Sequence, residues 1–401
     1  MKKILLILAF VALCISSSDA QTAAAKKIPH SHRLSNNAAA RRTEIILPKV
    51  NGFNCYKGDF HIHTSYSDGN LTPTARIHEA WYDGLDIVAI TDHYENQKGV
   101  KQFFKVAAGH ADEGQTIGYK SVSKSGKVST DFEEIHKMAE GQIEKSGYPM
   151  LLVRGCEMAR NAQSHGHFNI LFLSHFNDLY NKDMAQAFRN AKKQGAIIIH
   201  NHPAWRRKTS DKTEFHQQVY SEGLIDGIEV VNGTTFYPHI VRRCIDEKLT
   251  MYANTDEHGI TSARFGAAGF HRTMTLVFAK DLTEKAVKDA LLKGRTIAYA
   301  AGSLIGEEEW LKAFFNAAVE CRITKIDEKK GTRSFQVTNM SSITYRLRRG
   351  KTIYELEPFK SLRFDLGKDK KTGKYLEPKF VVDNMWHADY KHPSIQIELD
   401  K

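Results

Sequence analysis

Short apolar runs alternate with longer amphipathic runs between about residues 45 and 260, and the two kinds of run predict different elements. Apolar runs of about four to eight residues are typical of buried strands, whereas apolar residues spaced three and four apart are typical of helices. The predicted strands are "FHIH", "LDIVAIT", "MLLVRGCE", "HFNILFL", "AIIIHN", "IEVVNG" and "TMYANTD". The predicted helices are "LTPTARIHEAWYDG", "STDFEEIHKMAEGQIEKSG", "DMAQAFRNAKKQG" and "HIVRRCIDEK".

This alternation of strands and helices predicts an α/β fold built on a parallel sheet. The first helix has Pro73 in its first turn and Gly84 at its end, which are start and stop signals. Seven strand–helix units fit a closed barrel better than an open sheet, although periodicity alone leaves the closure open. We assign residues 51–304 to this barrel.

The pattern changes after about Leu304, where polar and apolar residues begin to alternate. The alternating stretches are "CRITKID", "RSFQVTN", "YRLRRGKTIYELEP", "LRFDLG" and "SIQIEL". Alternation with a period of two, interrupted by Gly and Lys turns, predicts half-buried strands. Residues 305–401 are therefore predicted to form a small, separate β-rich domain that resembles a sandwich.

The N-terminus has the features of a secretory signal peptide. Lys2 and Lys3 precede an apolar run that is too short to span a membrane comfortably, and Ser18-Asp19-Ala20 provides a small-residue cleavage site. We therefore expect residues 1–20 to be removed on export, into the periplasm if the host has two membranes and outside the cell otherwise. No transmembrane anchor is expected. Residues 21–50 predict a flexible leader that becomes ordered near Ile45.

Charge and cysteine content exclude some functions. The formal charge is +11, but residues 1–20, 21–50 and 305–401 carry +1, +5 and +4 of it, which leaves +1 for residues 51–304. A duplex-binding protein would concentrate basic residues on its working domain, so nucleic acid is not expected as the main substrate. The four cysteines beyond the signal peptide are far apart, which indicates neither a cysteine zinc site nor a disulfide framework, although one bridge remains possible.

Histidines and carboxylates lie at the ends of the predicted strands. They are His61, His63, Asp92, His93, Glu157, His167, His200, His202, Asp256 and His258. Side chains two residues apart on a strand point to the same face, so His61 and His63 project side by side, and Asp68 follows closely. In α/β barrels the loops after the strands converge on one axis and hold the active site. The pattern therefore predicts a metal centre of imidazole and carboxylate ligands.

The order of these motifs identifies a family. H-I-H-T-x-x-S-D-G, T-D-H, a strand-end Glu, H-x-x-I-L, H-P and a final D-x-H together resemble the polymerase-and-histidinol-phosphatase (PHP) superfamily over about residues 55–300. The resemblance implies a distorted (β/α)7 barrel, two or three metal ions, and hydrolysis of phosphate esters. The exported leader, "GRTIAY…GEEEWL" and the β-rich tail look like the secreted phosphodiesterase branch called the Sb-PDE family.

The resemblance also implies the metal ligands, which we transfer only where residues match. They are His61, His63, Glu157 and Asp256 for one ion, the bridging Glu157 with His167 and His202 for a second, and Asp68, His93 and His258 for a third. Some relatives place a His near the Asp68 position, which leaves the occupancy of the third site open. Oxygen and imidazole ligands suit zinc, manganese or iron alike.

Such a site would perform hydrolysis without a protein nucleophile. Two adjacent cations lower the pKa of a bridging water toward ~7, and the resulting hydroxide, held nearest Asp256 and Glu157, would attack phosphorus in line. The cations would also offset the charge that develops on the phosphoryl oxygens.

Some neighbouring residues allow two interpretations. His200 could replace His202 as a ligand, but His202-Pro203 matches the family motif and is favoured. Asp92 is expected to accept a hydrogen bond from a ligating imidazole, and His165 to be a loop residue. Three other histidines lie within helical runs and are expected at the surface, namely His78, His136 and His216.

Three arginines follow ligand positions and could bind a phosphate oxygen through two hydrogen bonds each. They are Arg160, Arg206 and Arg207, and for each a solvated arginine at the rim is at least as good an interpretation.

The leading hypothesis is an exported metal-dependent phosphodiesterase that acts on a small-molecule ester. A phosphomonoesterase would need a more cationic pocket for its dianionic substrate. The near-neutral charge of the barrel residues therefore disfavours this alternative. A metal-dependent hydrolase of carboxylic esters or amides is a second class, because the same nucleophile could attack a carbonyl. A binding protein without turnover is a third, which the full set of ligands disfavours.

Overall fold

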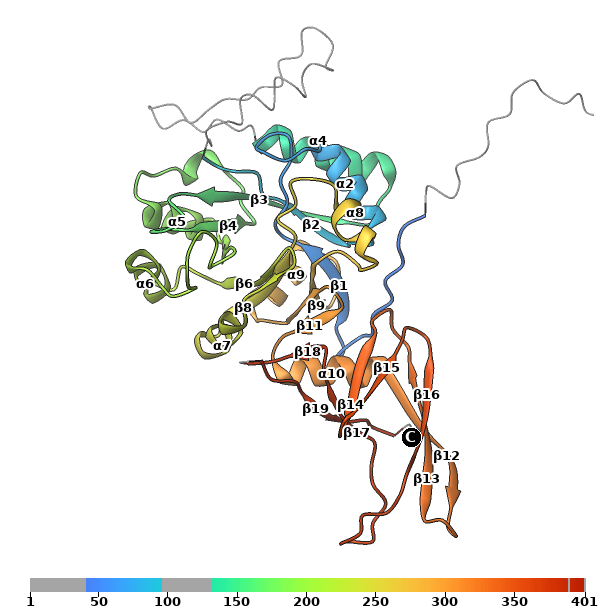
Figure 1. Cartoon of the computed structure of the whole chain (residues 1–401). Helices are drawn as coiled ribbons and strands as arrows, with labels where there is room; N and C mark the ends of the chain where they lie inside the picture. The colour runs from blue at the N-terminus through green and yellow to red at the C-terminus, as the bar shows by residue number, and fades with distance from the viewer. Residues whose placement is uncertain (1–40, 96–131, 389, 400–401) are drawn as a thin grey trace, which may run out of the picture. The chain divides into compact units, whose positions relative to one another are not determined.

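The computed structural model of the chain describes residues 41–95, 132–388 and 390–399 (Figure 1). The predicted signal peptide, most of the predicted leader and the first residues of the second predicted helix lie outside these ranges. From Arg42 onward the described chain belongs to one compact unit.

Seven strands follow one another around a curled sheet, and six of them overlap predicted strands. The seven are β1 (Asn54–Asp59), β2 (Ile87–Ile90), β3 (Leu151–Ala159), β4 (His167–Leu171), β5 (Ile197–His200), β6 (Gly227–Asn232) and β8 (Thr250–Asn254). The predicted strand "FHIH" (60–63) is wrong, because the first strand ends at Asp59 and only Ile62 forms a single bridge beyond it. The segments after β8 and β1 meet through a parallel bridge between Glu257 and Ile62. The predicted α/β fold and its distorted barrel are confirmed (Figure 1).

The sheet is not parallel throughout. Strand β4 runs antiparallel to both β3 and β5, while the other neighbouring barrel strands pair in parallel. Residues 160–166 connect β3 to β4 without a helix, and so short a connection can only reverse the chain. The expectation of a wholly parallel sheet is therefore wrong at β4.

Helices cover the barrel, and their ends follow the local sequence. They are α2 (Pro73–Tyr82), α4 (Phe132–Ser146), α5 (Met184–Lys193), α6 (Glu214–Ser221), α7 (Pro238–Glu247), α8 (Thr261–Arg264) and α9 (Glu284–Leu292), with short 3₁₀ turns η3 (Asn177–Leu179) and η4 (Gly266–Ala268). Helix α2 begins with Pro73, and the Thr72 hydroxyl caps it by accepting a hydrogen bond from the Ala75 N–H. Buried residues at helical spacing on α5, such as Ala187 and Ala191, attach it to the core.

The sheet continues beyond the barrel through strands that the sequence patterns did not predict. They are β9 (Met274–Ala279), which pairs with β1, then β10 (Thr296–Ala300), β11 (Ser303–Ile305) and β18 (Met385–Trp386). The hydroxyl of Thr275 on β9 bonds both the N–H and the C=O of Ala253 on β8, at 3.0 and 2.9 Å. A side chain thus links these two strands without a ladder of backbone bonds.

The C-terminal region begins with helix α10 (Glu308–Ala318), which the sequence patterns also did not predict. One antiparallel sheet contains β12 (Val319–Asp327), β13 (Thr332–Asn339) and β16 (Ser361–Leu366), and another contains β14 (Tyr345–Arg349), β15 (Thr352–Leu356), β17 (Lys379–Val382) and β19 (Ser394–Gln396). The β-rich character is confirmed. The domain boundary at 304/305 stays a prediction, because β18 pairs with β11 of the barrel sheet.

Two further features concern the described residues. Cys55, Cys156 and Cys244 are free thiols, so none of them forms the bridge that the sequence left possible. Among the described helices, none combines the length and the apolar composition that a membrane span requires.

A buried ion pair joins the end of β1 to the segment that precedes β9. The Asp59 carboxylate lies 2.6 Å from Nη2 of Arg272, and both side chains are at most 1% exposed. Arg272 also pairs with Asp83 at 3.0 Å. Asp59 accepts a further hydrogen bond from the Thr255 N–H at 3.1 Å, so the pair fixes three segments around the barrel.

We predict that Arg272→Met lowers the free energy of unfolding by about 3–5 kcal/mol, because Asp59 would lose its buried counter-ion. Chemical unfolding followed by circular dichroism measures the change. Lys293→Met, which removes a solvent-exposed pair with Asp289, is the control and should leave the unfolding midpoint nearly unchanged. An unchanged midpoint for Arg272→Met would contradict the importance assigned to this pair.

Candidate metal centre

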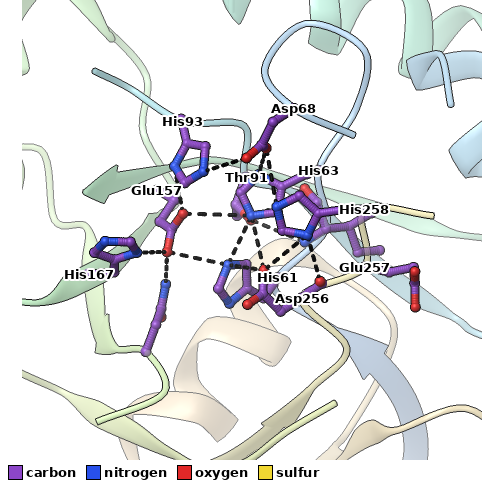
Figure 2. Close-up of polar contacts among 12 residues, drawn as sticks. His61, His63, Asp68, Thr91, His93, Glu157, His167, Asp256, Glu257 and His258 are labelled. Atoms are coloured by element: carbon purple, nitrogen blue, oxygen red, sulfur yellow. Dashed lines mark hydrogen bonds and ion pairs between the residues drawn. The ribbon is translucent and has the colours of Figure 1, made fainter. Parts of the chain in front are cut away.

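The structure brings the nine predicted ligands together at one end of the barrel (Figure 2). Six follow the ends of strands that run in the same direction: His61 and His63 come after β1, His93 after β2, His202 after β5, and Asp256 and His258 after β8. His167 begins β4, and the antiparallel direction of β4 places its first residue at the same rim. The motif order in the sequence thus becomes a cluster in space.

The first donor group contains His61, His63 and Asp256. Nε2 of His61 lies 3.1 Å from Nε2 of His63 and 3.1 Å from Oδ1 of Asp256, and the latter atom is 3.2 Å from Nε2 of His63. Glu157 completes the group, with carboxylate oxygens 3.5 Å from His61 and 3.6 Å from His63. A tetrahedral ion with bonds of about 2.0–2.1 Å separates its ligand atoms by about 3.4 Å. The distances among His61, His63 and Asp256 are close to this spacing, and Glu157 meets His61 through Oε1 and His63 through Oε2.

Glu157 belongs to a second donor group as well. Its Oε1 atom lies 3.2 Å from Nδ1 of His167 and 3.5 Å from Nε2 of His202. The amide of Asn201 donates to the same oxygen at 3.0 Å and so fixes the carboxylate. Because one carboxylate faces both groups, two ions held by them would be neighbours, as the predicted bridging role requires.

The third donor group surrounds Asp68. Its carboxylate oxygens lie 3.3 Å from Nε2 of His93 and 3.2 Å from Nε2 of His258. His63 also faces this group, with Nδ1 at 3.4 Å from Asp68, whereas the sequence placed His63 only in the first group. The His258 side chain is 39% exposed, so this group lies on the open side of the site.

Backbone and neighbouring groups fix which imidazole nitrogen is free to bind. Nδ1 of His258 donates to the Asp256 carbonyl at 2.9 Å, which leaves Nε2 directed toward Asp68.

Two ligands have an unusual backbone conformation. His202 and Asp256 have positive φ angles of 25° and 52°, a region that residues other than Gly seldom occupy. Such backbone strain at ligand positions is typical of functional sites.

Glu229 supports two ligands, and the sequence interpretation missed it. This fully buried carboxylate on β6 accepts hydrogen bonds from Nδ1 of His61 and from the His202 N–H, both at 2.8 Å. Asn254 and Asn232 also donate to it, at 3.0 and 2.9 Å. The sequence contained a signal, because a Glu inside the apolar run "GIEVV" needs buried partners.

Asp92 has a different role from the expected one. It accepts hydrogen bonds from the Thr64 N–H at 2.7 Å, from the Thr64 hydroxyl at 2.6 Å and from the Ser67 hydroxyl. Among the described residues it receives no bond from an imidazole. Asp92 therefore fixes the turn that carries Asp68, and the expected contact with a ligating histidine is wrong.

The alternative histidine ligand lies outside the cluster. Nδ1 of His200 shares a hydrogen bond of 2.8 Å with the Tyr220 hydroxyl, and its ring stacks on Phe168. His200 and His216 form a separate buried pair, with ring centroids 4.5 Å apart. The geometry therefore favours His202 over His200, as the motif did.

Two helix histidines are buried, and their expected surface position is wrong. Nδ1 of His136 donates to the Phe132 carbonyl at 2.6 Å, and Nε2 of His216 donates to the His165 carbonyl at 2.7 Å. Both lie on helix faces that turn toward the core. His78 is half-buried and shares a hydrogen bond with Tyr148 at 2.8 Å.

The three arginines proposed for substrate binding differ in their contacts. Arg160 bonds a Glu95 oxygen at 3.0 Å and two backbone carbonyls, so its guanidinium is already occupied. Arg207 donates to the carbonyls of Pro203 and Asp211 within its own loop. Arg206 is exposed and lies over the ring of Trp205, at 4.4 Å from the ring centre, which leaves its guanidinium accessible at the rim.

The pKa directions reflect a site of closely packed opposite charges. Burial alone would raise the pKa of Glu157, but the neighbouring imidazoles, His93 first, hold it well below its usual value. Asp256 behaves likewise: burial opposes ionisation, and His61 foremost among its neighbours holds the pKa low. Burial, followed by the nearby His258, lowers the pKa of His63 to about 4. The carboxylates are therefore ionised and His63 is neutral at pH 7. Burial opposes the charged form of His61 and His93, but Asp256 beside His61 and Glu157 beside His93 raise the pKa of each imidazole well above its usual value, so a bound cation would have to displace these protons.

A family model, the PHP domain, matches residues 59–227. The chain also resembles a solved two-domain protein of Bacteroides vulgatus that contains a predicted PHP-like metal-dependent phosphoesterase. The two are 31% identical with a TM-score of 0.75, over 90% of this chain and 99% of the other. No curated protein matches the chain.

Two more distant structures also match the chain in part. A protein of Bifidobacterium adolescentis described as a metal-dependent phosphoesterase is 14% identical, over 59% of this chain and 96% of its own, with a TM-score of 0.36. The lesion-specific endonuclease of Pyrococcus furiosus is 13% identical, over 63% of this chain and 59% of its own, with a TM-score of 0.37. Neither carries an argument about this chain's substrate. The family match and the near-complete alignment with the Bacteroides protein place this chain in the PHP family, with the fold of a PHP-like metal-dependent phosphoesterase.

Proposed function

We propose that the protein is a metal-dependent phosphodiesterase that binds two or three divalent ions. The observation that carries the proposal is the position of Glu157, whose one carboxylate lies within 3.6 Å of donors in both the first and the second group. The first two ions would be held by the first two groups, and a third by Asp68, His93 and His258. Bound divalent ions supply a nucleophile at neutral pH and offset charge on the phosphoryl oxygens.

The chain's own residues hold this chemistry in place. Glu229 keeps Nδ1 of His61 protonated and therefore directs the Nε2 lone pair of His61 toward Asp256. Asn201 orients Glu157, and the turn fixed by Asp92 positions Asp68. Zinc, manganese and iron all suit these nitrogen and oxygen donors.

The charge around the donor groups favours a diester over a monoester. A monoester is a dianion and needs more cationic partners than a monoanionic diester. Of the three arginines that follow ligand positions, Arg160 and Arg207 bond protein oxygens and Arg206 remains accessible, as does Lys208 farther along the same loop. The near-neutral charge of residues 51–304 agrees with this preference.

The proposal includes export and a place in the secreted Sb-PDE branch. The support is the signal-like sequence of residues 1–20, the motif "GRTIAY…GEEEWL" and the β-rich tail. The substrate would be a small phosphate ester outside the cytoplasm, in the periplasm of a host with two membranes. Nucleic acid is not proposed as the main substrate, because the basic excess lies in the flanks.

We predict metal-dependent hydrolysis of bis(p-nitrophenyl) phosphate, faster than that of p-nitrophenyl phosphate. The protein should be inactive after chelation and recover with manganese, zinc or iron. His61→Ala should lower kcat/KM by at least about 100-fold, because it removes a donor of the first group. His175→Ala, at an exposed position away from the site, is the matched control.

Release of p-nitrophenol, together with the metal content per chain, provides the measurement. Rapid monoester turnover without diester turnover would assign a monoesterase instead. Bound metal without activity on either ester would redirect the search to carboxylic esters and amides.

We predict that Glu229→Gln weakens metal binding and kcat by about 10- to 100-fold. A glutamine amide cannot accept hydrogen bonds at both of its ends, so either His61 or the His202 N–H loses its partner. Titration against a chromogenic chelator measures the affinity. Glu144→Gln, on the exposed face of α4, should behave as the wild type, and equal affinities in all three proteins would contradict the role assigned to Glu229.

We predict that Trp205→Ala raises KM for an aryl diester by about 3- to 10-fold, whereas Trp205→Phe retains most of the affinity. The Trp205 ring contacts those of His167 and His202, at centroid distances of 4.8 and 5.4 Å, and is 41% exposed at the rim. An aromatic leaving group can therefore stack on it. Steady-state kinetics with bis(p-nitrophenyl) phosphate provide the test, and an unchanged KM in Trp205→Ala would exclude this contact.

A further inference from the structure

A cavity lies beside the loop that follows the ligand His202. It has a volume of about 470 Å³, which is within the range of small-molecule sites. Its wall includes Ala204, two residues beyond the ligand His202, and Tyr237 at the start of α7. Helix α7 packs against β6, the strand that carries Glu229 (Figure 1). The cavity is thus built from the same loop and strand that position two ligands of the metal centre.

Tyr237 connects the cavity to the metal centre. Its N–H bonds the Val230 carbonyl at 2.9 Å, next to Glu229 on β6. Burial and then the negative charges of Glu229 and Asp256 raise the pKa of the Tyr237 hydroxyl. Tyr237 thus lines the cavity while its backbone is bonded to the residue next to Glu229.

The cavity carries an excess of positive charge. Lys208 and Arg243 line it together with a single acidic residue, Asp211. Within the described residues, neither Lys208 nor Arg243 forms an ion pair. Nη1 of Arg243 is enclosed by protein, and the guanidinium lies beside the Tyr220 hydroxyl. Two cations without a carboxylate partner leave this wall positively charged, which an anionic oxygen would offset.

Two other features of the wall suit an anion attached to an organic group. The first turn of α7, with His239, borders the cavity, and the amino end of a helix carries partial positive charge. The rings of Phe236 and Tyr237 provide an apolar wall beside these cations. The cavity therefore combines donors for an anion with a surface for the carbon skeleton that bears it.

We propose that this cavity binds an anionic group, phosphate or carboxylate, on one ester arm of the substrate. The preferred diesters then carry a second negative charge beyond the scissile phosphate. The inference rests on the proposed function, because it assumes that the scissile phosphate binds at the metal centre. The inference goes beyond the proposed function because it names the substrate class and the two residues, Lys208 and Arg243, that select this class.

The kinetic test uses a matched pair of diesters, the p-nitrophenyl ester of thymidine 5′-phosphate with and without a 3′-phosphate. The metal-loaded wild type should prefer the 3′-phosphorylated ester by about tenfold or more in kcat/KM. Lys208→Ala and Arg243→Ala should each lose most of that preference while hydrolysing bis(p-nitrophenyl) phosphate at the wild-type rate. Lys285→Ala, exposed on α9, is the control and should retain the preference.

Equal efficiencies for the two esters in the wild type, or a preference that survives in both variants, would overturn the cavity assignment and leave the phosphodiesterase proposal intact. If no diester is hydrolysed, calorimetric binding of thymidine 3′,5′-bisphosphate against thymidine 5′-phosphate at fixed salt replaces the kinetics. Tighter binding of the bisphosphate that disappears in the two variants supports the cavity. A bisphosphate that binds no more tightly than the monophosphate overturns it.

Discussion

The site depends on a single buried carboxylate that has to remain charged. Glu157 is 1% exposed, and removing a carboxylate from water is costly unless charges and donors surround it. His61, His167, His202 and Asn201 approach one of its oxygens, and His63 and His93 approach the other. Six groups can surround one carboxylate only if β1, β2, β3 and β5 end, and β4 begins, at the same rim of the barrel. The barrel fold and the site therefore require the same arrangement of strands.

The ligands were predictable from the sequence because they follow apolar strands directly. A run such as "AIIIHNHP" reveals both the strand and the polar residue at its end, and the parallel strands of a barrel bring such ends together. His167 is different, since it begins its strand. Its place in the cluster follows from the reversal at residues 160–166, and only the family motif indicated it.

The supporting residues were harder to predict, because their partners are distant in the sequence. Glu229 lies 168 positions from His61, the imidazole it orients, and nothing local specifies that contact. Asp92 was correctly predicted to lie beside the ligands, but its hydrogen-bond donors are the turn residues Thr64 and Ser67 and not an imidazole. The sequence does not distinguish these two kinds of donor. The helices α9 and α10 and strand β9 were missed although the sequence carries their signals, since β9 is the apolar run "MTLVFA" and Leu311, Phe314 and Phe315 are spaced as on a helix face.

The pairing of β18 with β11 means that the barrel sheet is completed late in the chain. Residues Met385 and Trp386 supply the outermost strand, 81 positions after their partners Leu304 and Ile305. During synthesis, β18 would leave the ribosome only after strands β12 to β17, and of the C-terminal sheets only β19 follows it. Until then β11 would expose unpaired N–H and C=O groups, the kind of open edge on which chains associate with one another. The C-terminal region thus covers the open edge of the barrel sheet once the whole chain has been synthesised.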